Sequence, residues 1–204
     1  MKSIFIYGQN YILKNYLNAF NSKNLKVVCS TDISLAENCT SLLLAGGGDI
    51  CPTLYGETNY FSKDIDYKRD LDELYLIDYF SHQKKTIIGI CRGLQVINTF
   101  FGGTIIQHID GHSQLEGKDT THPIVCRNNG FLYGFFGKTA LVNSAHHQAI
   151  NTCGKGLIPD SISPDGIIES VYHYHLPIYA VQFHPERMTD GKRLVNFISH
   201  KIHI

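Results

Sequence analysis

Cys91 is the residue of this sequence best placed to act as a nucleophile. It is the middle residue of Gly89-Ile90-Cys91-Arg92-Gly93, a G-x-C-x-G pattern between an apolar run at 86–90 and a helical pattern. This is the cysteine counterpart of the G-x-S-x-G nucleophile elbow, whose middle residue adopts a strained backbone conformation. The N–H groups of the first helical turn stabilise a thiolate there. The alternative, a buried free thiol before a helix, is how we interpret four other cysteines: Cys29, Cys39, Cys126 and Cys153.

A cysteine nucleophile needs a base, and His184 is the strongest candidate among the eleven histidines. It begins His184-Pro185-Glu186, directly after the apolar run 178–183. Residues two apart in an extended chain point to the same side, and Pro185 favours an extended segment. We therefore expect Glu186 to orient the imidazole while the imidazole faces Cys91. Without Cys91, the pair would be interpreted as a strand-end histidine beside a solvated glutamate.

The histidines do not show the spacing of a metal site. A zinc site built on H-x-E needs a downstream P-C-x-x-C, which this sequence lacks. The pairs His146-His147 and His173/His175 also lack ligand partners at the usual spacing. We expect no metal and no organic cofactor.

Three consecutive glycines, Gly46-Gly47-Gly48, follow the apolar run 41–45. Backbone N–H groups in such a loop could stabilise a developing oxyanion. A sharp turn after a strand would explain the three glycines equally well.

Apolar runs alternate with helical patterns along the first half of the chain, which predicts a parallel sheet with helices on both faces. Leu71, Leu74 and Ile77 are the expected inward residues of one helix, and Gly102-Gly103 is expected to end another in a left-handed conformation. The predicted strands are 3–7, 25–29, 41–45, 86–90, 104–109, 123–126, 139–143, 166–172 and 178–183. The predicted helices lie at 13–20, 68–82, 92–101 and 191–200.

Length and composition predict one globular α/β domain over residues 1–204. The chain has 43% hydrophobic and 18% charged residues and a formal net charge of zero, which does not favour a nucleic-acid or membrane-surface partner. The N-terminal segment has too short an apolar run for a signal peptide, and no stretch approaches a membrane span. The six cysteines include no C-x-x-C pair. We expect a cytoplasmic protein with reduced thiols.

Several motifs together resemble the class I (triad) glutamine amidotransferases, and more narrowly their hydrolytic branch, the γ-glutamyl-γ-aminobutyrate hydrolase-like (peptidase C26-type) proteins. The motifs occur in the family's order between about residues 42 and 186: LLAGGGDICPTLYGE, KRDLDE, GICRGLQVIN, GGTIIQHI, VNSAHHQAI, DGIIES and VQFHPE. The resemblance implies a flavodoxin-like three-layer sandwich with a central, mostly parallel sheet and a small antiparallel β addition.

The resemblance also implies roles for particular residues. It implies a Cys91–His184–Glu186 triad and an oxyanion hole made by the N–H groups of Gly47 and Arg92. It implies glutamyl contacts from Gln95 and from the loop that carries Asn143, Ser144, His146 and His147. Substrate recognition or loop anchoring is the implied role of two further residues, Arg69 and Glu73.

Three function classes remain open. The first is a hydrolase of a γ-glutamylated small molecule, such as γ-glutamyl-γ-aminobutyrate, a γ-glutamyl-polyamine product or γ-glutamyl-CDP-amidate. The second is a glutaminase subunit that delivers ammonia to a synthetase partner. The RD-x-x-E and HHQ segments favour the first over the second. The third is a non-catalytic module on the same fold, against which the intact triad argues. A homodimer is compatible with each of these classes.

Overall fold

The computed structural model describes residues 2–9, 13–20 and 25–201, and in these ranges nine strands form one sheet. The strand order is β2-β1-β3-β4-β11-β10-β9-β6-β7. The bounds of the strands are β1 Lys2–Tyr7, β2 Leu25–Ser30, β3 Ser41–Leu44, β4 Thr86–Ile90, β6 Thr120–Cys126, β7 Thr139–Ser144, β9 Leu157–Ile162, β10 Ile168–His173 and β11 Ile178–Val181. A separate antiparallel pair joins β5 (Thr104–Ile106) to β8 (Ala149–Thr152).

The sheet has a parallel half and an antiparallel half. Strands β2, β1, β3, β4 and β11 pair in parallel, in the order typical of flavodoxin-like folds. Strands β10, β9, β6 and β7 extend the sheet in antiparallel pairing. The carboxyl ends of β3 and β4 are therefore neighbours, which brings the loops after Leu44 and Ile90 together.

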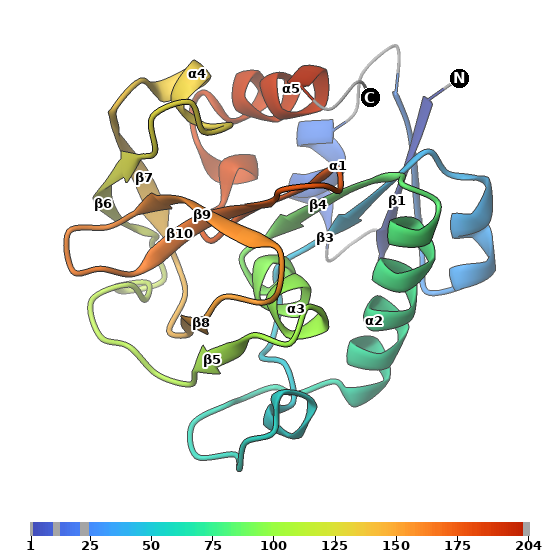
Figure 1. Ribbon diagram of the computed structural model, residues 1–204, viewed down its shortest axis with the longest axis horizontal. Coiled ribbons are helices and arrows are strands. Elements are labelled where there is room, and N and C mark those ends of the chain that lie inside the picture. Colours follow the sequence, from blue (N-terminus) through green and yellow to red (C-terminus); the bar gives the residue numbers. More distant parts are fainter. Residues whose placement is uncertain (1, 10–12, 21–24, 202–204) are drawn as a thin grey trace.

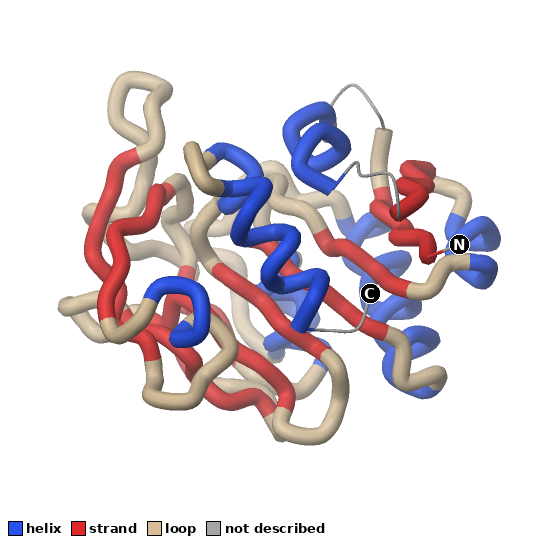
Figure 2. The backbone as a smooth tube through the Cα atoms, turned by 90° about the horizontal axis from the view of Figure 1, so that it is seen from above, coloured by secondary structure: helices blue, strands red, loops and turns tan. Residues whose placement is uncertain are grey.

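Helices cover both faces of the sheet, as Figure 1 shows. Helices α1 and α5 lie on one face, where Figure 2 shows α5 crossing above the strands, and α2 and α3 lie on the other. The helix bounds are α1 Lys14–Phe20, α2 Tyr67–His82, α3 Arg92–Phe100, α4 Tyr133–Phe136 and α5 Gly191–Lys201, with short 3-10 turns η1 Ile33–Asn38, η2 Pro52–Tyr55 and η3 Pro185–Arg187. No helix of the described ranges is long and apolar enough to cross a membrane.

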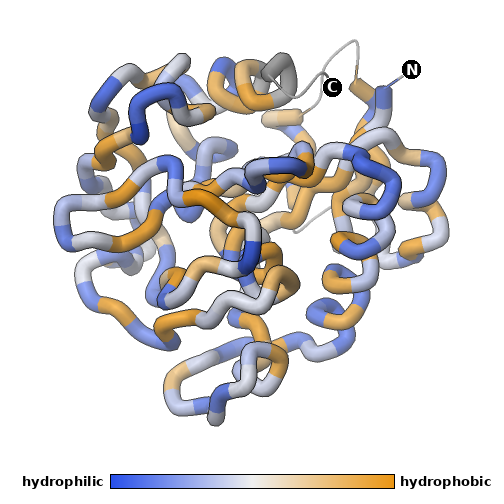
Figure 3. Tube along the Cα trace, in the orientation of Figure 1, coloured by the Kyte–Doolittle hydropathy of each residue, from blue (hydrophilic) through white to orange (hydrophobic). Residues whose placement is uncertain are grey.

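Successive side chains of the buried strands point to opposite faces of the sheet, so the molecule has one hydrophobic core on each face. In β1, Ile4 and Ile6 face the core under α1 and α5, while Phe5 and Tyr7 face the core under α2 and α3. Figure 3 accordingly shows hydrophobic colour along the central strands and hydrophilic colour on many outer loops. Strands buried on both faces read as continuous apolar runs, which is why the sequence pattern identified them.

The three-layer α/β fold is confirmed. The left-handed end of α3 is also confirmed, because Gly102 has a φ of 80°. The predicted final helix is present, with Leu194 and Ile198 buried and Phe197 half-buried. Strands β8 and β9 are not predicted by the pattern, and the strand expected at 104–109 ends at Ile106.

The predicted inward face of α2 is wrong at Leu71, while Leu74 packs against the core in part. Leu71 is 47% exposed and Leu74 is only partly buried, whereas Asp70 and Glu73 are fully buried. The buried face of α2 includes two carboxylates that form ion pairs with Arg92. A prediction from apolar spacing cannot find such a face, because it treats carboxylates as exposed.

Candidate active site

Cys91 lies in the strained turn predicted for it. It joins β4 to α3 with φ 54° and ψ −107°, and its N–H donates to Val181 O at 2.8 Å. The turn needs glycine on both sides, because a Cβ at Gly89 would lie 2.8 Å from the Gly93 backbone and a Cβ at Gly93 would collide with the Leu44 carbonyl. The elbow geometry is thus confirmed. The Cys91 side chain is almost buried, with 7% of the residue exposed.

His184 and Glu186 meet after the end of β11. His184 Nδ1 lies 2.7 Å from Glu186 Oε1, and both side chains are buried. Burial lowers the pKa of His184, but the charges and hydrogen bonds of Cys91 and Glu186 outweigh it and raise that pKa to about 9. The predicted extended conformation is wrong, because Pro185–Arg187 forms a 3-10 turn. The predicted contact between the two side chains is present despite that.

Gly46 lies between Cys91 and His184. A Cβ at Gly46 would lie 3.0 Å from His184 Cε1, 3.6 Å from Cys91 Cβ and 2.8 Å from Tyr16 Oη. These distances show that the side chains of Cys91 and His184 both lie against Gly46. A side chain at this position would displace Tyr16 or His184.

Tyr16 is a residue of this site that the sequence pattern assigned only to a helix face. Its Oη accepts a hydrogen bond from the Gly46 N–H at 2.9 Å and lies 3.5 Å from His184 Nδ1. Burial, followed by the charges of Glu186 and Cys91, raises the pKa of Tyr16 well above its usual value, so the phenol stays neutral. No sequence signal distinguishes Tyr16 from the apolar residues of α1.

The glycine loop is held by Arg69 of α2. Its Nη2 donates to Ala45 O at 3.0 Å and to Gly46 O at 3.1 Å. A Cβ at Gly47 would collide with the same guanidinium. Gly47 comes shortly after β3, and Arg92 comes shortly after β4. Because these two strands are parallel neighbours, the two N–H groups lie at the same edge of the sheet. Of the two roles considered for Arg69, this geometry fits loop anchoring.

Arg92 and Glu73 join Arg69 in a buried ionic network that also includes Asp70. The Arg92 guanidinium pairs with both Asp70 and Glu73, and Arg69 Nε lies 2.8 Å from Glu73 Oε1. Burial lowers the pKa of Arg92, but the two carboxylates outweigh it and raise that pKa. Two cations and two anions balance, and the network joins α2 to the start of α3. The sequence placed Asp70 only within the RD-x-x-E segment, because its ion pair depends on a partner from another helix.

The side chains expected to contact a glutamyl group mostly make protein contacts. Asn143 donates to His184 O at 3.0 Å and accepts from the His184 N–H at 3.1 Å. Ser144 Oγ donates to His112 O at 2.8 Å. Gln95 Nε2 lies 3.3 Å from both Gln148 O and Gln182 Oε1. Asn143 therefore positions His184.

The two neighbouring histidines of the loop point to different surroundings. His147 is half-buried, and its Nε2 lies 2.9 Å from Asp49 Oδ2. His146 is buried, and its ring faces two other histidines and Glu169. Only His147 of this pair thus remains partly accessible from solvent.

The sequence matches the family model described as Peptidase C26 over residues 9–186. It is 36% identical over 166 residues to "Putative glutamine amidotransferase PB2B2.05" of Schizosaccharomyces pombe, covering 77% of this chain and 66% of that protein. It is 30% identical over 148 residues to the γ-glutamyl-CDP-amidate hydrolase of Campylobacter jejuni, covering 72% and 62%.

Solved structures show the same fold. A glutamine amidotransferase of Thermotoga maritima superposes with a TM-score of 0.67 at 14% identity, covering 99% of this chain and 84% of that one. The chain spans just under two thirds of the length of the two curated relatives named above. The match of the family model includes the glycine loop, the elbow and the His184–Glu186 pair. The chain belongs to the peptidase C26 family.

Proposed function

We propose that this protein hydrolyses a γ-glutamyl amide bond through a thioester on Cys91. The observation that carries the proposal is the placement of a strained cysteine at a helix N-terminus beside a buried His184 whose pKa is raised to about 9. A histidine with this pKa is protonated at neutral pH, and an imidazolium beside a thiol favours the thiolate.

The reaction would proceed in two halves. The Cys91 sulfur attacks the γ-carbonyl carbon, and the N–H groups of Gly47 and Arg92 stabilise the negative oxygen of the tetrahedral intermediate. His184 donates its proton to the departing nitrogen as the C–N bond breaks. Neutral His184 then takes a proton from water, whose oxygen attacks the thioester. Glutamate leaves, and the thiolate–imidazolium pair is restored.

The contacts around the triad supply its orientation. Glu186 binds His184 Nδ1, which leaves Nε2 for Cys91 and the substrate. Asn143 holds the His184 backbone on both its N–H and its carbonyl. Arg69 holds the loop that contains Gly47 by donating hydrogen bonds to the carbonyl oxygens of Ala45 and Gly46. The three reacting parts are thus fixed by separate elements of the fold.

The names of two relatives support a substrate class. A relative is named a γ-glutamyl-CDP-amidate hydrolase, and another is named a γ-glutamyl-γ-aminobutyrate hydrolase. We therefore propose a γ-glutamylated small molecule as substrate, with an amine or an amidate as the leaving group, and a cytoplasmic site of action.

A panel of γ-glutamyl amides, with glutamate release as the readout, tests the proposal. The purified chain should release glutamate without a partner protein, and Cys91→Ser should abolish the release. Glutaminase activity that appears only when a synthetase is added would instead support the ammonia-delivering role. Glutamate release that persists in Cys91→Ala would overturn the mechanism.

A further inference from the structure

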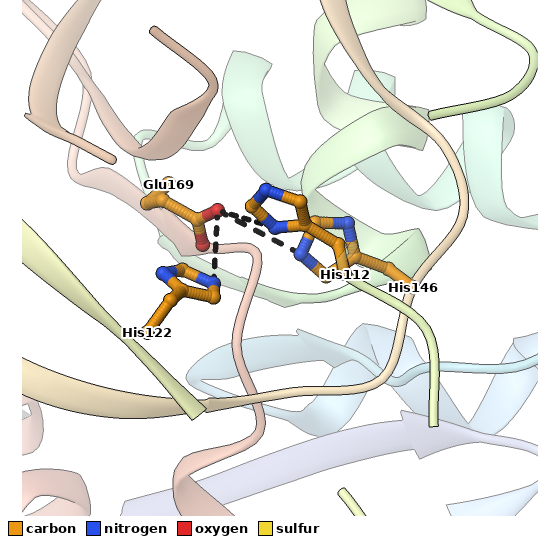
Figure 4. Close-up of side chains that lie close together, drawn as sticks. All are labelled: His112, His122, His146 and Glu169. Carbon is orange, nitrogen blue, oxygen red and sulfur yellow. Dashed lines mark ion pairs between the residues drawn. The ribbon is translucent and has the colours of Figure 1, made fainter. Parts of the chain in front are cut away.

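Three histidines and one glutamate form a buried cluster in the antiparallel half of the molecule. Figure 4 shows the three rings arranged around one carboxylate. The residues come from four segments: the loop after β5, strand β6, the loop between β7 and β8, and strand β10. Their ligand atoms all lie within 4.8 Å of one another, and the members of this four-residue cluster are His112, His122, His146 and Glu169.

We propose that the four-residue cluster binds one divalent transition-metal ion, with zinc as the first candidate. Glu169 Oε1 lies 3.4 Å from His112 Nδ1, 3.4 Å from His122 Nε2 and 3.7 Å from His146 Nε2. Ligand bonds of about 2.1 Å in a tetrahedron place neighbouring ligand atoms about 3.4 Å apart. The spacing of the cluster fits such an ion.

Among the described residues, the inward atoms of the cluster lie within ion-pair distance of one another but take part in no hydrogen bond. His112 Nδ1, His122 Nε2, His146 Nε2 and both carboxylate oxygens of Glu169 are buried without a hydrogen-bond partner among the described residues. Glu169 is fully buried, so its carboxylate needs a cation or donors.

In each of the three rings, the nitrogen that points away from Glu169 lies near a hydrogen-bond acceptor. His112 Nε2 lies 2.9 Å from Asp165 Oδ2, and His146 Nδ1 lies 3.0 Å from Gln148 O. His122 Nδ1 lies 3.2 Å from Pro123 O. Each acceptor favours a proton on the outward nitrogen, so a neutral ring presents its inward nitrogen as a lone pair. Carboxylates and carbonyls bind metal-ligating histidines in this way.

Three lone pairs directed at a carboxylate repel one another unless a positive charge lies between them. A single proton joins two of the four groups, whereas a divalent ion binds all four. Imidazole and carboxylate donors suit zinc and similar first-row ions. Four nearly buried protein ligands would fill the positions of a tetrahedron, which is the arrangement of a closed site.

The ion would fix the loop that leads from β7 to β8. Within that loop His146 N–H also donates to His112 O at 3.0 Å, and Ser144 Oγ donates to the same carbonyl. Asn143, at the end of β7, holds the His184 backbone. The inference does not depend on the substrate or on the reaction proposed above.

Metal binding by the untagged chain tests the inference directly. After dialysis against a chelator and its removal, Co²⁺ should bind at one ion per chain, with the visible bands of a four-coordinate nitrogen–oxygen site and without a thiolate charge-transfer band. Zn²⁺ should displace it and raise the temperature of unfolding. Wild-type protein that shows no saturable site would overturn the proposal and leave shared protons as the explanation.

Matched variants locate the site. Glu169→Gln and His122→Gln should abolish the Co²⁺ bands, Asp165→Asn should weaken binding about 10- to 100-fold, and the exposed control His175→Gln should bind as the wild type does. Wild-type affinity in Glu169→Gln would contradict the assignment. The wild-type titration decides the question even if a ligand variant does not fold.

Discussion

The residues around His184 determine the charge state in which the candidate site rests. Cys91 and Glu186 together raise the pKa of His184 to about 9 against the effect of burial. A raised pKa means that the imidazolium persists through neutral pH and is lost as the pH rises through about 9. Proton donation to a departing nitrogen should be lost over the same range.

Replacing Glu186 by Gln should therefore change the pH dependence of the reaction. The wild-type value of kcat/KM should fall above a pH of about 9. In Glu186→Gln this fall should begin at lower pH, and kcat should drop by about 10²- to 10⁴-fold because the imidazole is less well oriented. The measurement is kcat/KM against pH for both proteins, and an unchanged alkaline fall would contradict the pairing.

Asn143 offers a second test at the same scale. Asn143→Ala removes both hydrogen bonds to the His184 backbone, so we expect kcat to fall by about 10²-fold while KM changes little. Asn151→Ala, which removes an exposed hydrogen bond to Thr104, is the control and should leave both constants unchanged. A variant Asn143→Ala that raised only KM would indicate substrate contact instead.

At the scale of elements, the position of α3 depends on contacts with β3 and α2. Gly93 allows the helix to approach the Leu44 carbonyl, and Arg92 binds the two carboxylates of α2. These contacts fix the start of the helix that carries the Cys91 turn. Stability and site geometry are therefore linked at this point.

Gly93→Ala should lower the free energy of unfolding by about 1–3 kcal/mol and also reduce activity, because α3 must shift away from β3. Gly102→Ala is the matched control. Its Cβ meets no atom within 4 Å, so its positive φ of 80° should cost about 1–2 kcal/mol without loss of activity. Denaturant unfolding and glutamate release measure the two effects, and equal activity in both variants would contradict this account.

Arg92→Met should cost about 3–5 kcal/mol of unfolding free energy, because it removes the cation that pairs with buried Asp70 and one of the two cations that pair with buried Glu73. Lys68→Met breaks the exposed pair with Asp72 and should change stability by less than about 1 kcal/mol. Urea unfolding of the two variants gives the comparison. Adding Asp70→Asn and Glu73→Gln to Arg92→Met should recover part of the loss, and the absence of any recovery would argue against the network.

At the scale of the whole molecule, the two halves of the sheet are continuous. Strand β11 pairs in parallel with β4 and antiparallel with β10, so hydrogen bonds cross the boundary between the halves without a gap. The two cores both receive residues from each half, including Ile124 in one and Val171 in the other. One domain over residues 1–204 stays our prediction, and this continuity of the described strands is the reason for it.

The molecule should accordingly unfold in one cooperative transition. Calorimetry of the chain at fixed metal content should give a single peak, with equal calorimetric and van't Hoff enthalpies. Near-UV and far-UV circular dichroism should follow the same curve. Two separated transitions would show that the parallel and antiparallel halves are independent units.

The sequence by itself determined the features that are local in the chain. The doubly buried strands, the glycine-flanked turn at Cys91 and the proximity of His184 to Glu186 all depend on neighbours within a few residues. Their periodicity and spacing are therefore visible in one dimension. The strand order of the parallel half follows from the alternation of strands and helices together with the family resemblance.

Only the tertiary structure decided the contacts that join distant segments. Tyr16 meets Gly46 and His184 because α1 packs beside the carboxyl ends of the strands. Asp70 is buried because Arg92 arrives from another helix, so an apolar pattern alone misplaced the face of α2. The four-residue cluster has ligands on four separate segments. No spacing rule along the chain can show such a site, because folding alone brings its atoms within bonding distance of one ion.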